Sequence, residues 1–361
     1  MNAPLLEVRD LHVEIPLPGG TLRALRGVSF TADAGEAVGI VGESGSGKSL
    51  TLRAVLGLLP VPARITGGTI LLDGADVSAT PDKQRRALLT SSMSMVFQDS
   101  LTALNPVMRV GEQIAEIPRR RLGMSRRDAR ARAVELMDRV GIPDPDRRYD
   151  VYPHQMSGGM RQRVCIAIAL SGSPRLILAD EPTTALDVTI QAQVLEVLRD
   201  LREREGLGVV LVSHDLAVVS QTCSRLHVMY AGRIVEQGRT GALLGRPRHP
   251  YTFSLLRSVP DPDRPATQLL AISGQPPDLT EPVTGCSFAP RCLAVHDECR
   301  VDEPDLVDAG APTRQTACRR WETASGWPGI AAAEMAEEAE RVAEVAHELV
   351  EHDHEYAEGA R

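Results

Sequence analysis

A short segment near residue 45 has the residue types and spacing of a phosphate-binding loop. Residues 42–49 read Gly-Glu-Ser-Gly-Ser-Gly-Lys-Ser, so four residues separate Gly42 from Gly47, and lysine and serine follow. Glycines let backbone N–H groups turn toward phosphate oxygens, the Lys48 ammonium can reach the β- and γ-phosphates, and the Ser49 hydroxyl can ligate Mg²⁺. Lys48 is one of only two lysines in the chain, so average composition does not explain it. We therefore expect a nucleoside triphosphate to be bound by Gly42, Glu43, Ser44, Gly45, Ser46, Gly47, Lys48 and Ser49.

Two later segments end in side chains that suit triphosphate hydrolysis. Residues 175–179 are mostly apolar and lead into Asp180 and Glu181, and the apolar residues 208–212 lead into His214 two positions further on. The first acid can hold Mg²⁺ and the second can polarise an attacking water. A lone histidine is more often structural. Because His214 follows a strand as Asp180 and Glu181 do, we favour a functional role for it.

The elements that position these residues are strands and helices in alternation. Residues 37–41 are apolar and β-branched and run directly into the glycine-rich loop, and a helical pattern follows from Leu50 to about Leu59, where Pro60 ends it. Three such strands would present the loop, the acid pair and the histidine at their carboxyl ends, where parallel α/β sheets bind ligands. The predicted fold class is α/β.

A second anion site is indicated further along the chain. Ser157, Gly158 and Gly159 precede a helical run over residues 164–170, and the free N–H groups at such a helix start attract anions. One chain seldom needs two such sites for one triphosphate. We therefore expect each to serve a different nucleotide, one of which is held by a second subunit.

The order and spacing of these motifs over about residues 5–325 resemble the nucleotide-binding subunit of ABC transporters, a P-loop NTPase fold with a helical subdomain. The matching motifs are the Walker A motif (42–49), the Q-loop with Gln98 (95–99), the signature (156–160), the Walker B motif ending at Asp180 with Glu181 next, the D-loop (185–187) and the switch histidine His214.

The resemblance implies a head-to-tail dimer with two ATP molecules between the subunits. It implies that Glu181 is the general base or water-polarising residue, that His214 contacts the γ-phosphate, and that Gln98 senses Mg²⁺ and reports to membrane subunits. Ser49, Gln98 and Asp180 are then the residues expected around Mg²⁺.

Three segments resemble the oligopeptide, dipeptide and nickel importer branch, namely residues 100–106, 152–155 and 249–252. The branch implies an ATPase that powers peptide import through two transmembrane permeases and, indirectly, an extracytoplasmic binding protein, from a peripheral place on the cytoplasmic face of the membrane. Residues 158–163 together with 179–187 resemble the first, D-type, of the branch's two different ATPase subunits. The second typically has glutamine where this chain has Met160, which favours a heterodimer over a homodimer. An importer for nickel or another small solute is the alternative, followed by a non-transport ABC ATPase.

Changes in composition divide the chain into three parts. We expect an ATPase domain over residues 1–245 with its helical subdomain at about 100–156, a proline-rich extension with four cysteines over 246–325, and an acidic helical or disordered tail over 326–361. The ten acidic residues and two arginines from Ile330 onward account for the net charge of −8. The remaining chain is nearly neutral and aromatic residues make up 3%, which argues against nucleic acid as a partner.

Four of the six cysteines lie within 33 residues, with five, six and eighteen residues between them. Clustered thiols in a reducing compartment more often indicate a metal than disulfides, and four thiolates suit zinc or an iron–sulfur cluster. Zinc sites usually have tighter pairs. The resemblance to the peptide-importer extension implies a [4Fe-4S] cluster, with zinc and metal-free thiols as alternatives. The cysteines concerned are Cys286, Cys292, Cys299 and Cys318.

Overall fold

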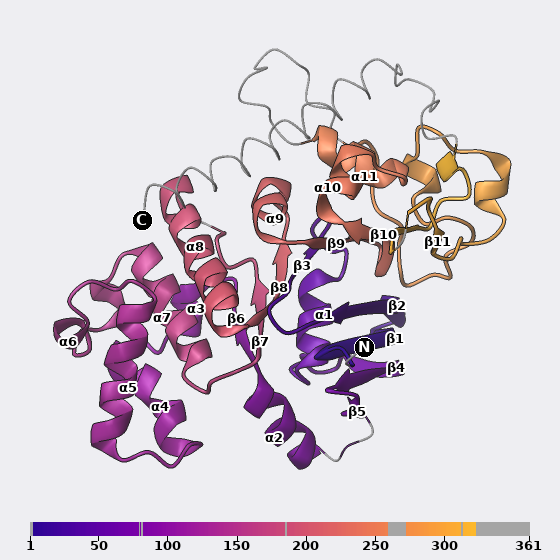
Figure 1. Cartoon of the computed structure of the whole chain (residues 1–361). Coiled ribbons are helices and arrows are strands. Elements are labelled where there is room, and N and C mark those ends of the chain that lie inside the picture. Colours follow the sequence, from indigo (N-terminus) through magenta and orange to yellow (C-terminus); the bar gives the residue numbers. More distant parts are fainter. Residues whose placement is uncertain are drawn as a thin grey trace.

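The computed structural model describes residues 3–78, 80, 82–184, 186–258, 272–311 and 313–322. The predicted tail over residues 326–361 lies outside the described residues, as does Ala185 of the D-loop motif. The described chain forms two β-sheets with helices on both sides (Figure 1). This arrangement confirms the predicted α/β fold class.

The larger sheet has eight strands in the described part of the chain, and its centre is parallel. The short strands β11 and β12 extend its edge in antiparallel pairing with β10. In spatial order the strands are β11 (Val307–Asp308), β12 (Gln315–Thr316), β10 (Arg233–Arg239), β9 (Arg225–Tyr230), β3 (Ala37–Val41), β8 (Gly208–Ser213), β7 (Leu176–Asp180) and β6 (Met93–Val96).

The central strands are apolar at nearly every position because both faces of the sheet are covered. In β3, for example, Val38 and Ile40 belong to one hydrophobic core, and Ala37 and Val41 belong to the other. Side chains alternate between the faces of a strand, so a strand buried on both faces is apolar throughout.

The smaller sheet is antiparallel and covers one face of the larger one. Its order is β2 (Gly20–Ala32), β1 (Leu6–Leu17), β4 (Arg64–Leu72) and β5 (Ala75–Asp76). Helix α1 (Lys48–Val55) shares the hydrophobic core between these two sheets.

Helix α1 ends earlier than the sequence pattern predicted. We expected it to continue to about Leu59, before Pro60. Instead Gly57 adopts a left-handed conformation with φ of 67°, the N–H of Gly57 donates to Ala54 O at 3.1 Å, and the N–H of Leu58 donates to Arg53 O at 2.8 Å. These two bonds form a Schellman motif, which ends the helix before the proline is reached.

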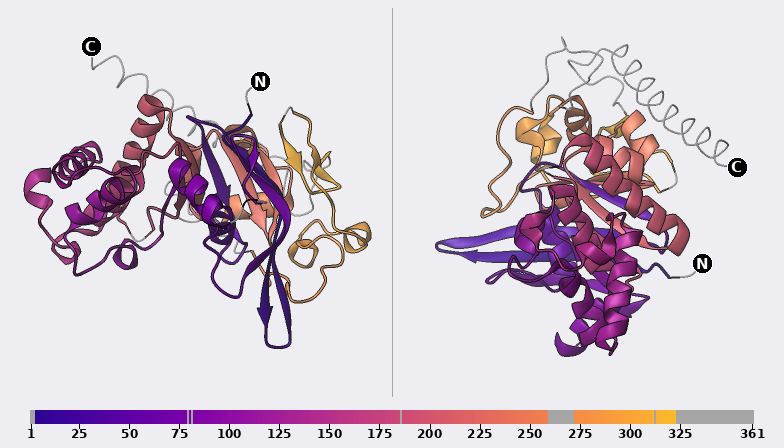
Figure 2. Two further views of the ribbon diagram at one scale, coloured as in Figure 1. Left: turned by 90° about the horizontal axis from the view of Figure 1, so that it is seen from below. Right: turned by 90° about the vertical axis from the view of Figure 1, so that its left-hand side faces the viewer.

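Helices cover the opposite face of the large sheet and form a lobe at one side of the molecule (Figures 1 and 2). Ser125 caps α5 by accepting from the N–H of Asp128 at 3.2 Å, so this helix begins at Arg126. Helix α2 (Asp82–Ser92) instead contributes Leu89 to the core that contains α1. The further helices described are α3 (Ser100–Ala103), α4 (Val110–Arg120), α5 (Arg126–Arg139), α6 (Pro145–Arg148), α7 (Gly158–Leu170), α8 (Val188–Glu205), α9 (Leu216–Thr222), α10 (Thr240–Gly245) and α11 (Pro250–Arg257).

The segment after α11 lies on the side of the sheets opposite to the helical lobe (Figure 2). It is joined to the large sheet by β12 and contains two short 3-10 helices, Ala289–Arg291 and Asp297–Arg300. Phe288 is buried against Tyr230 and Tyr251, so the segment shares the main hydrophobic core. Among the helices described, none has the length and apolar character needed to cross a membrane.

Candidate nucleotide-binding site

The glycine-rich loop connects β3 to α1 and approaches its neighbours too closely for side chains at two positions. Gly42 has φ of 153°, and a Cβ there would lie 2.1 Å from the carbonyl oxygen of Met229. Gly47 has φ of 105°, and its Cβ would lie 2.7 Å from the Leu25 side chain. Only glycine fits both the dihedral angles and the contacts. The sequence of the loop is therefore dictated by its packing against β9 and β2.

Lys48 is the first residue of α1, and its ammonium group lies inside the loop. Its Nζ donates to the carbonyl oxygens of Gly42 at 2.7 Å and Glu43 at 3.0 Å. Burial lowers the pKa of Lys48, an effect that the carboxylates of Glu181 and Asp180 oppose. A cation at the start of a helix is an attractive site for a phosphate anion, because the helix dipole adds to its charge.

Ser49 and Asp180 lie side by side between α1 and the end of β7. The Ser49 hydroxyl donates to Asp180 Oδ1 at 2.6 Å. Asp180 is 1% exposed, and burial raises its pKa. A buried carboxylate is stabilised by a cation, and hydroxyl and carboxylate oxygens are ligands that Mg²⁺ prefers. The residues present therefore fit a bound Mg²⁺ ion.

Glu181 is the point at which the predicted catalytic residues meet. Its Oε2 accepts a hydrogen bond from Gln98 Nε2 at 2.9 Å and lies 3.1 Å from His214 Nδ1. Gln98 follows β6, Glu181 follows β7 and His214 follows β8, so three adjacent parallel strands deliver the three side chains to one edge. Glu181 has a φ of 46°, which is rare for a residue with a side chain. Such backbone strain is found at functional sites.

Thr184 also contacts this carboxylate, although the sequence analysis did not single it out. Its hydroxyl donates to Glu181 Oε2 at 2.9 Å, and its N–H donates to the Glu181 carbonyl at 3.2 Å. A local pattern in the sequence could have indicated this contact. A threonine three positions after an acid can form a hydrogen bond with the acid's side chain when the residues between them form a turn.

The helix predicted over residues 164–170 begins earlier, so that Ser157, Gly158 and Gly159 form the start of α7. Ser157 caps the helix by accepting from the N–H of Met160 at 3.3 Å, and a Cβ on Gly159 would lie 2.2 Å from the Ile190 side chain in α8. Helix α7 packs in the core on one face of the large sheet, and α1 packs in the core on the other face. The two glycine-rich helix starts thus belong to opposite faces of the sheet, and Figure 1 shows the helices apart.

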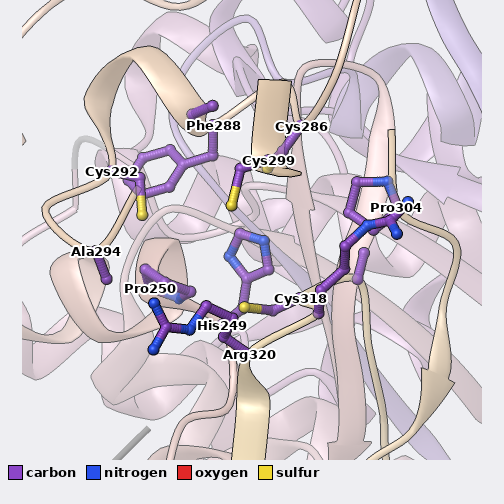
Figure 3. Close-up of a pocket in the computed structure, with 13 residues that line it drawn as sticks. His249, Pro250, Cys286, Phe288, Cys292, Ala294, Cys299, Pro304, Cys318 and Arg320 are labelled. Carbon is purple, nitrogen blue, oxygen red and sulfur yellow. The ribbon is translucent and has the colours of Figure 1, made fainter. Parts of the chain in front are cut away.

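The prediction of a [4Fe-4S] cluster on Cys286, Cys292, Cys299 and Cys318 is contradicted. All four thiols line one cavity of about 30 Å³ together with His249 and Phe288 (Figure 3). Within the described residues, however, no group of three or more His, Cys, Asp or Glu side chains is placed to hold a metal ion.

Burial shifts the titration of the thiols in this cavity. It raises the pKa of the Cys286 thiol, that of Cys292 to about 11 and that of Cys318 to about 12. The cavity is comparable to the volume of one or two water molecules.

Two families match the sequence. Residues 25–184 match the family described as ABC transporter, and residues 235–299 match the one described as oligopeptide/dipeptide transporter, C-terminal region.

Three relatives of this chain are ATP-binding proteins of peptide transport. The dipeptide transport ATP-binding protein DppD of Bacillus subtilis is 48% identical over 289 residues, which cover 80% of this chain and 86% of DppD. DppD of Escherichia coli is 44% identical over 314 residues, covering 87% of this chain and 96% of that protein. The oligopeptide transport ATP-binding protein OppD of Bacillus subtilis is 48% identical, covering 80% of this chain and 81% of OppD.

Solved structures of ATP-binding cassettes share the fold. The cassette MJ0796, in a dimeric post-hydrolysis state bound to ADP and Pi, has a TM-score of 0.59 and 29% identity, covering 65% of this chain and 98% of that one. The cbiO1 protein of Clostridium perfringens, part of the transporter complex cbiONQ, has a TM-score of 0.58 and 26% identity, covering 67% of this chain and 91% of that one.

Proposed function

This chain belongs to the ABC transporter family, and from that premise we propose that it is the ATP-hydrolysing subunit that powers an importer of dipeptides or oligopeptides. The matches to DppD and OppD support the peptide branch over 80% or more of the chain. The match of residues 235–299 to the C-terminal region of these transporters supports the same assignment independently of the ATPase motifs.

In this proposal, different residues bind the phosphates and the Mg²⁺ ion. The N–H groups of residues 42–47 and the Lys48 ammonium bind the phosphates, and Ser49 and Asp180 hold Mg²⁺, with Gln98 beside them. The ion supplies positive charge to the phosphate oxygens when it is bound. Lys48 is held in place by two carbonyl oxygens of the loop, at 2.7 and 3.0 Å, so little reorganisation is needed when the phosphates bind.

Glu181 polarises the attacking water in this proposal, and His214 contacts the γ-phosphate. The observation that carries the assignment is the sharing of one carboxylate oxygen, Glu181 Oε2, among Gln98, Thr184 and His214. These three contacts fix the position of Oε2, and none of them involves Oε1. An oriented carboxylate at the carboxyl edge of the sheet is suited to accept a proton from water.

Replacing Glu181 with glutamine tests this role. The amide keeps the shape of the side chain but cannot act as a base, so we expect turnover to fall by about 10²–10⁴-fold while ATP still binds. Glu203→Gln is the matched control, because Glu203 is exposed on α8 and contacts Arg202. Hydrolysis by Glu181→Gln at the rate of the control would contradict the assignment.

The position of the second glycine-rich helix start supports a dimer. Because α7 and α1 pack on opposite faces of the sheet, we propose that Ser157, Gly158 and Gly159 bind the nucleotide of a partner subunit. The partner in this proposal is a second, homologous ATPase, which makes the pair a heterodimer. Two transmembrane permeases and, through them, an extracytoplasmic binding protein complete the importer, with this chain at the cytoplasmic face.

Purification of the tagged chain from native membranes tests the assembly. Mass spectrometry of what co-purifies should find two polytopic membrane proteins and one further ATPase of the family. A single kind of ATPase subunit would contradict the heterodimer. Recovery of ribosomal or DNA-repair proteins without any membrane protein would contradict transport and leave the ATPase chemistry in place.

A further inference from the structure

The C-terminal segment reaches back to the phosphate-binding loop through a buried arginine. Arg291, at the end of a 3-10 helix, forms two parallel hydrogen bonds with the carboxylate of Glu43, Nη1 to Oε2 at 2.7 Å and Nη2 to Oε1 at 3.0 Å. The Arg291 side chain is 4% exposed. Paired, charge-assisted bonds of this kind are among the strongest hydrogen bonds in proteins. Glu43, a residue of the phosphate-binding loop, is therefore held by a side chain that lies 248 positions later in the sequence.

The guanidinium group of Arg291 is itself fixed by its surroundings. Its Nε donates to the Ser273 carbonyl at 3.1 Å, Nη2 donates to the Ile272 carbonyl at 3.0 Å, and Nη1 donates to the Tyr230 hydroxyl at 3.3 Å. The hydrogen bond to Glu43 raises the pKa of Arg291, which is charged at any pH the protein tolerates. Arg291 is thus a rigid element of the C-terminal segment.

Glu43 is also held through its backbone. Its N–H donates to the hydroxyl of Tyr251 at 2.8 Å, and Tyr251 is fully buried in α11. Its carbonyl oxygen accepts from Lys48 Nζ at 3.0 Å. The side chain, the N–H and the carbonyl of one loop residue are all occupied, and the last of these bonds is made by the lysine that faces the phosphates.

We propose that Arg291 and Tyr251 are positioning residues for ATP binding: they set the conformation of Glu43 and, through its carbonyl, the place of the Lys48 ammonium. The C-terminal segment is by this inference a working part of the nucleotide site. The inference rests on the proposed ATP hydrolysis only for its kinetic readout, because nucleotide binding can be measured without turnover.

A second ion pair in the same segment provides a matched control. Glu303 forms two parallel bonds with Arg26 of β2, at 2.7 and 3.0 Å, and both side chains are less than one-fifth exposed. This pair also joins the C-terminal segment to the ATPase part of the chain, with the same chemistry and similar burial. Glu303 also contacts Arg233 of β10 at 3.0 Å, and the hydrogen bonds and ion pairs described for the Arg26 and Glu303 side chains reach no residue of the loop.

The test compares Arg291→Gln with Glu303→Gln in the full-length chain. Equilibrium binding of the fluorescent analogue TNP-ATP should weaken by about tenfold in Arg291→Gln, the effect of losing one strong charged hydrogen-bond pair. Glu303→Gln should bind within about twofold of wild type, although both variants lower Tm. In steady-state hydrolysis, Arg291→Gln should raise KM for ATP more than it lowers kcat. An equal change in affinity in both variants, or none in Arg291→Gln, would overturn the proposal.

Two milder variants keep the test decisive if Arg291→Gln does not fold. Arg291→Lys retains the charge and loses the paired geometry, so its affinity should lie between those of wild type and Arg291→Gln. Tyr251→Phe retains the ring and removes the hydroxyl, so affinity should fall by about threefold. Wild-type affinity in both would overturn the inference. A wild-type chain that binds TNP-ATP and does not hydrolyse ATP would contradict the proposed function instead, and the binding comparison would still apply.

Discussion

At the scale of single residues, the site concentrates its hydrogen bonds on one oxygen of Glu181. Gln98 and His214 reach it from neighbouring strands, but Thr184 reaches it from within the same turn. A carboxylate held by short local contacts keeps its orientation even when the more distant side chains move. Thr184 is therefore expected to orient the carboxylate, without itself touching a phosphate.

Substitution of Thr184 by valine isolates this effect. Valine keeps the shape and removes the hydroxyl, so we expect kcat to fall by about three- to tenfold, in line with the loss of one hydrogen bond to a charged group. The KM for ATP should stay within twofold of wild type, because the phosphate contacts are unchanged. Steady-state kinetics checks both values. An unchanged kcat with a raised KM would mean that Thr184 acts in binding.

Most of these residues could be named from the sequence. Glu181 and His214 follow predicted strands, Gln98 was identified from the resemblance of residues 95–99 to the Q-loop, and the three side chains meet at one oxygen. Arg291 was not identified, because its partner Glu43 is 248 positions away and no local pattern links them. Residues that act through long-range packing leave no periodic signal in a single sequence.

At the scale of elements, the loop between β3 and α1 offers a comparison between two glycines. Gly42 and Gly45 both have positive φ, at 153° and 80°, but only at Gly42 would a Cβ meet a neighbouring backbone atom, the Met229 carbonyl at 2.1 Å. At Gly45 the space is open. A side chain at Gly45 would therefore cause backbone strain alone, whereas a side chain at Gly42 would cause both strain and a steric clash.

We expect Gly42→Ala to abolish ATP binding and Gly45→Ala to reduce it mildly. Alanine in the left-handed region costs about 1–2 kcal/mol at either site. The collision at Gly42 adds the displacement of β9 or of the loop, typically about 1–3 kcal/mol more. Urea denaturation and nucleotide binding measure the two effects. Equal behaviour of the two variants would show that the close approach to β9 does not constrain the loop.

The start of α11 predicts a pH dependence of stability. His249 is fully buried, its Nδ1 accepts from the N–H of Tyr251 at 3.1 Å, and burial lowers its pKa to about 3. In the unfolded chain its pKa is about 6.5. The unfolded state therefore binds a proton that the folded state does not, and the stability that is present above pH 6.5 is lost as the pH falls toward 3.

His249→Asn should weaken this dependence, because asparagine can cap the helix and does not titrate. Between pH 7.5 and 5.5, wild type should lose about 1.4 kcal/mol more unfolding free energy than the variant. Urea denaturation at the two pH values measures the difference. The variant is less stable at both, since a smaller side chain leaves space in the core, and only the slope with pH decides. Equal slopes would contradict the assignment of a neutral histidine.

Periodicity predicted the elements better than their ends. The strand at residues 37–41 and the helix ending at Leu170 lie where the apolar pattern placed them. Helix α1 ends at Val55 because of the left-handed Gly57, whereas the more conspicuous Pro60 had been expected to end it. The capping motif requires a left-handed conformation at one residue. Glycine can adopt this conformation but does not always do so, and its presence in the sequence therefore does not fix the helix end.

At the scale of the whole molecule, the C-terminal segment shares the core of the ATPase. The rings of Tyr230, Tyr251 and Phe288 are packed with centroids 4.6 to 5.4 Å apart, although the predicted domain boundary at residue 245 falls between the first and the other two. Aromatic clusters of this kind add to stability beyond the area that they bury. A boundary drawn from composition alone cuts through this contact.

A chain that ends after Gly245 should therefore be unstable. Loss of the partners of Tyr230 is comparable to removal of a large buried side chain, about 3–5 kcal/mol, which lowers Tm by about 6–20 °C in a chain of this size. Thermal unfolding and the soluble yield measure this. A chain that ends after Glu322 keeps the cluster and is the control. A truncated protein that melts within about 2 °C of the control would establish residues 1–245 as an independent domain.

The cysteine-rich part shows where composition misled. Four clustered thiols indicated a metal, yet in the part of the chain that the structure describes no three His, Cys, Asp or Glu side chains are placed to hold one. Spacing in a sequence reports which side chains can meet. It does not report whether the folded chain places the side chains in the geometry that a metal ion needs.

The separation of Glu43 from Arg291 also has a meaning in time. A ribosome adds about 5–20 residues per second, so the 248 positions between them correspond to about 12–50 s of synthesis. During that interval the growing chain already carries its phosphate-binding loop, and the arginine that holds the loop does not yet exist. By the inference drawn above, the loop reaches its final form only after Arg291 has been synthesised. A shorter chain lacks the ion pair that holds Glu43.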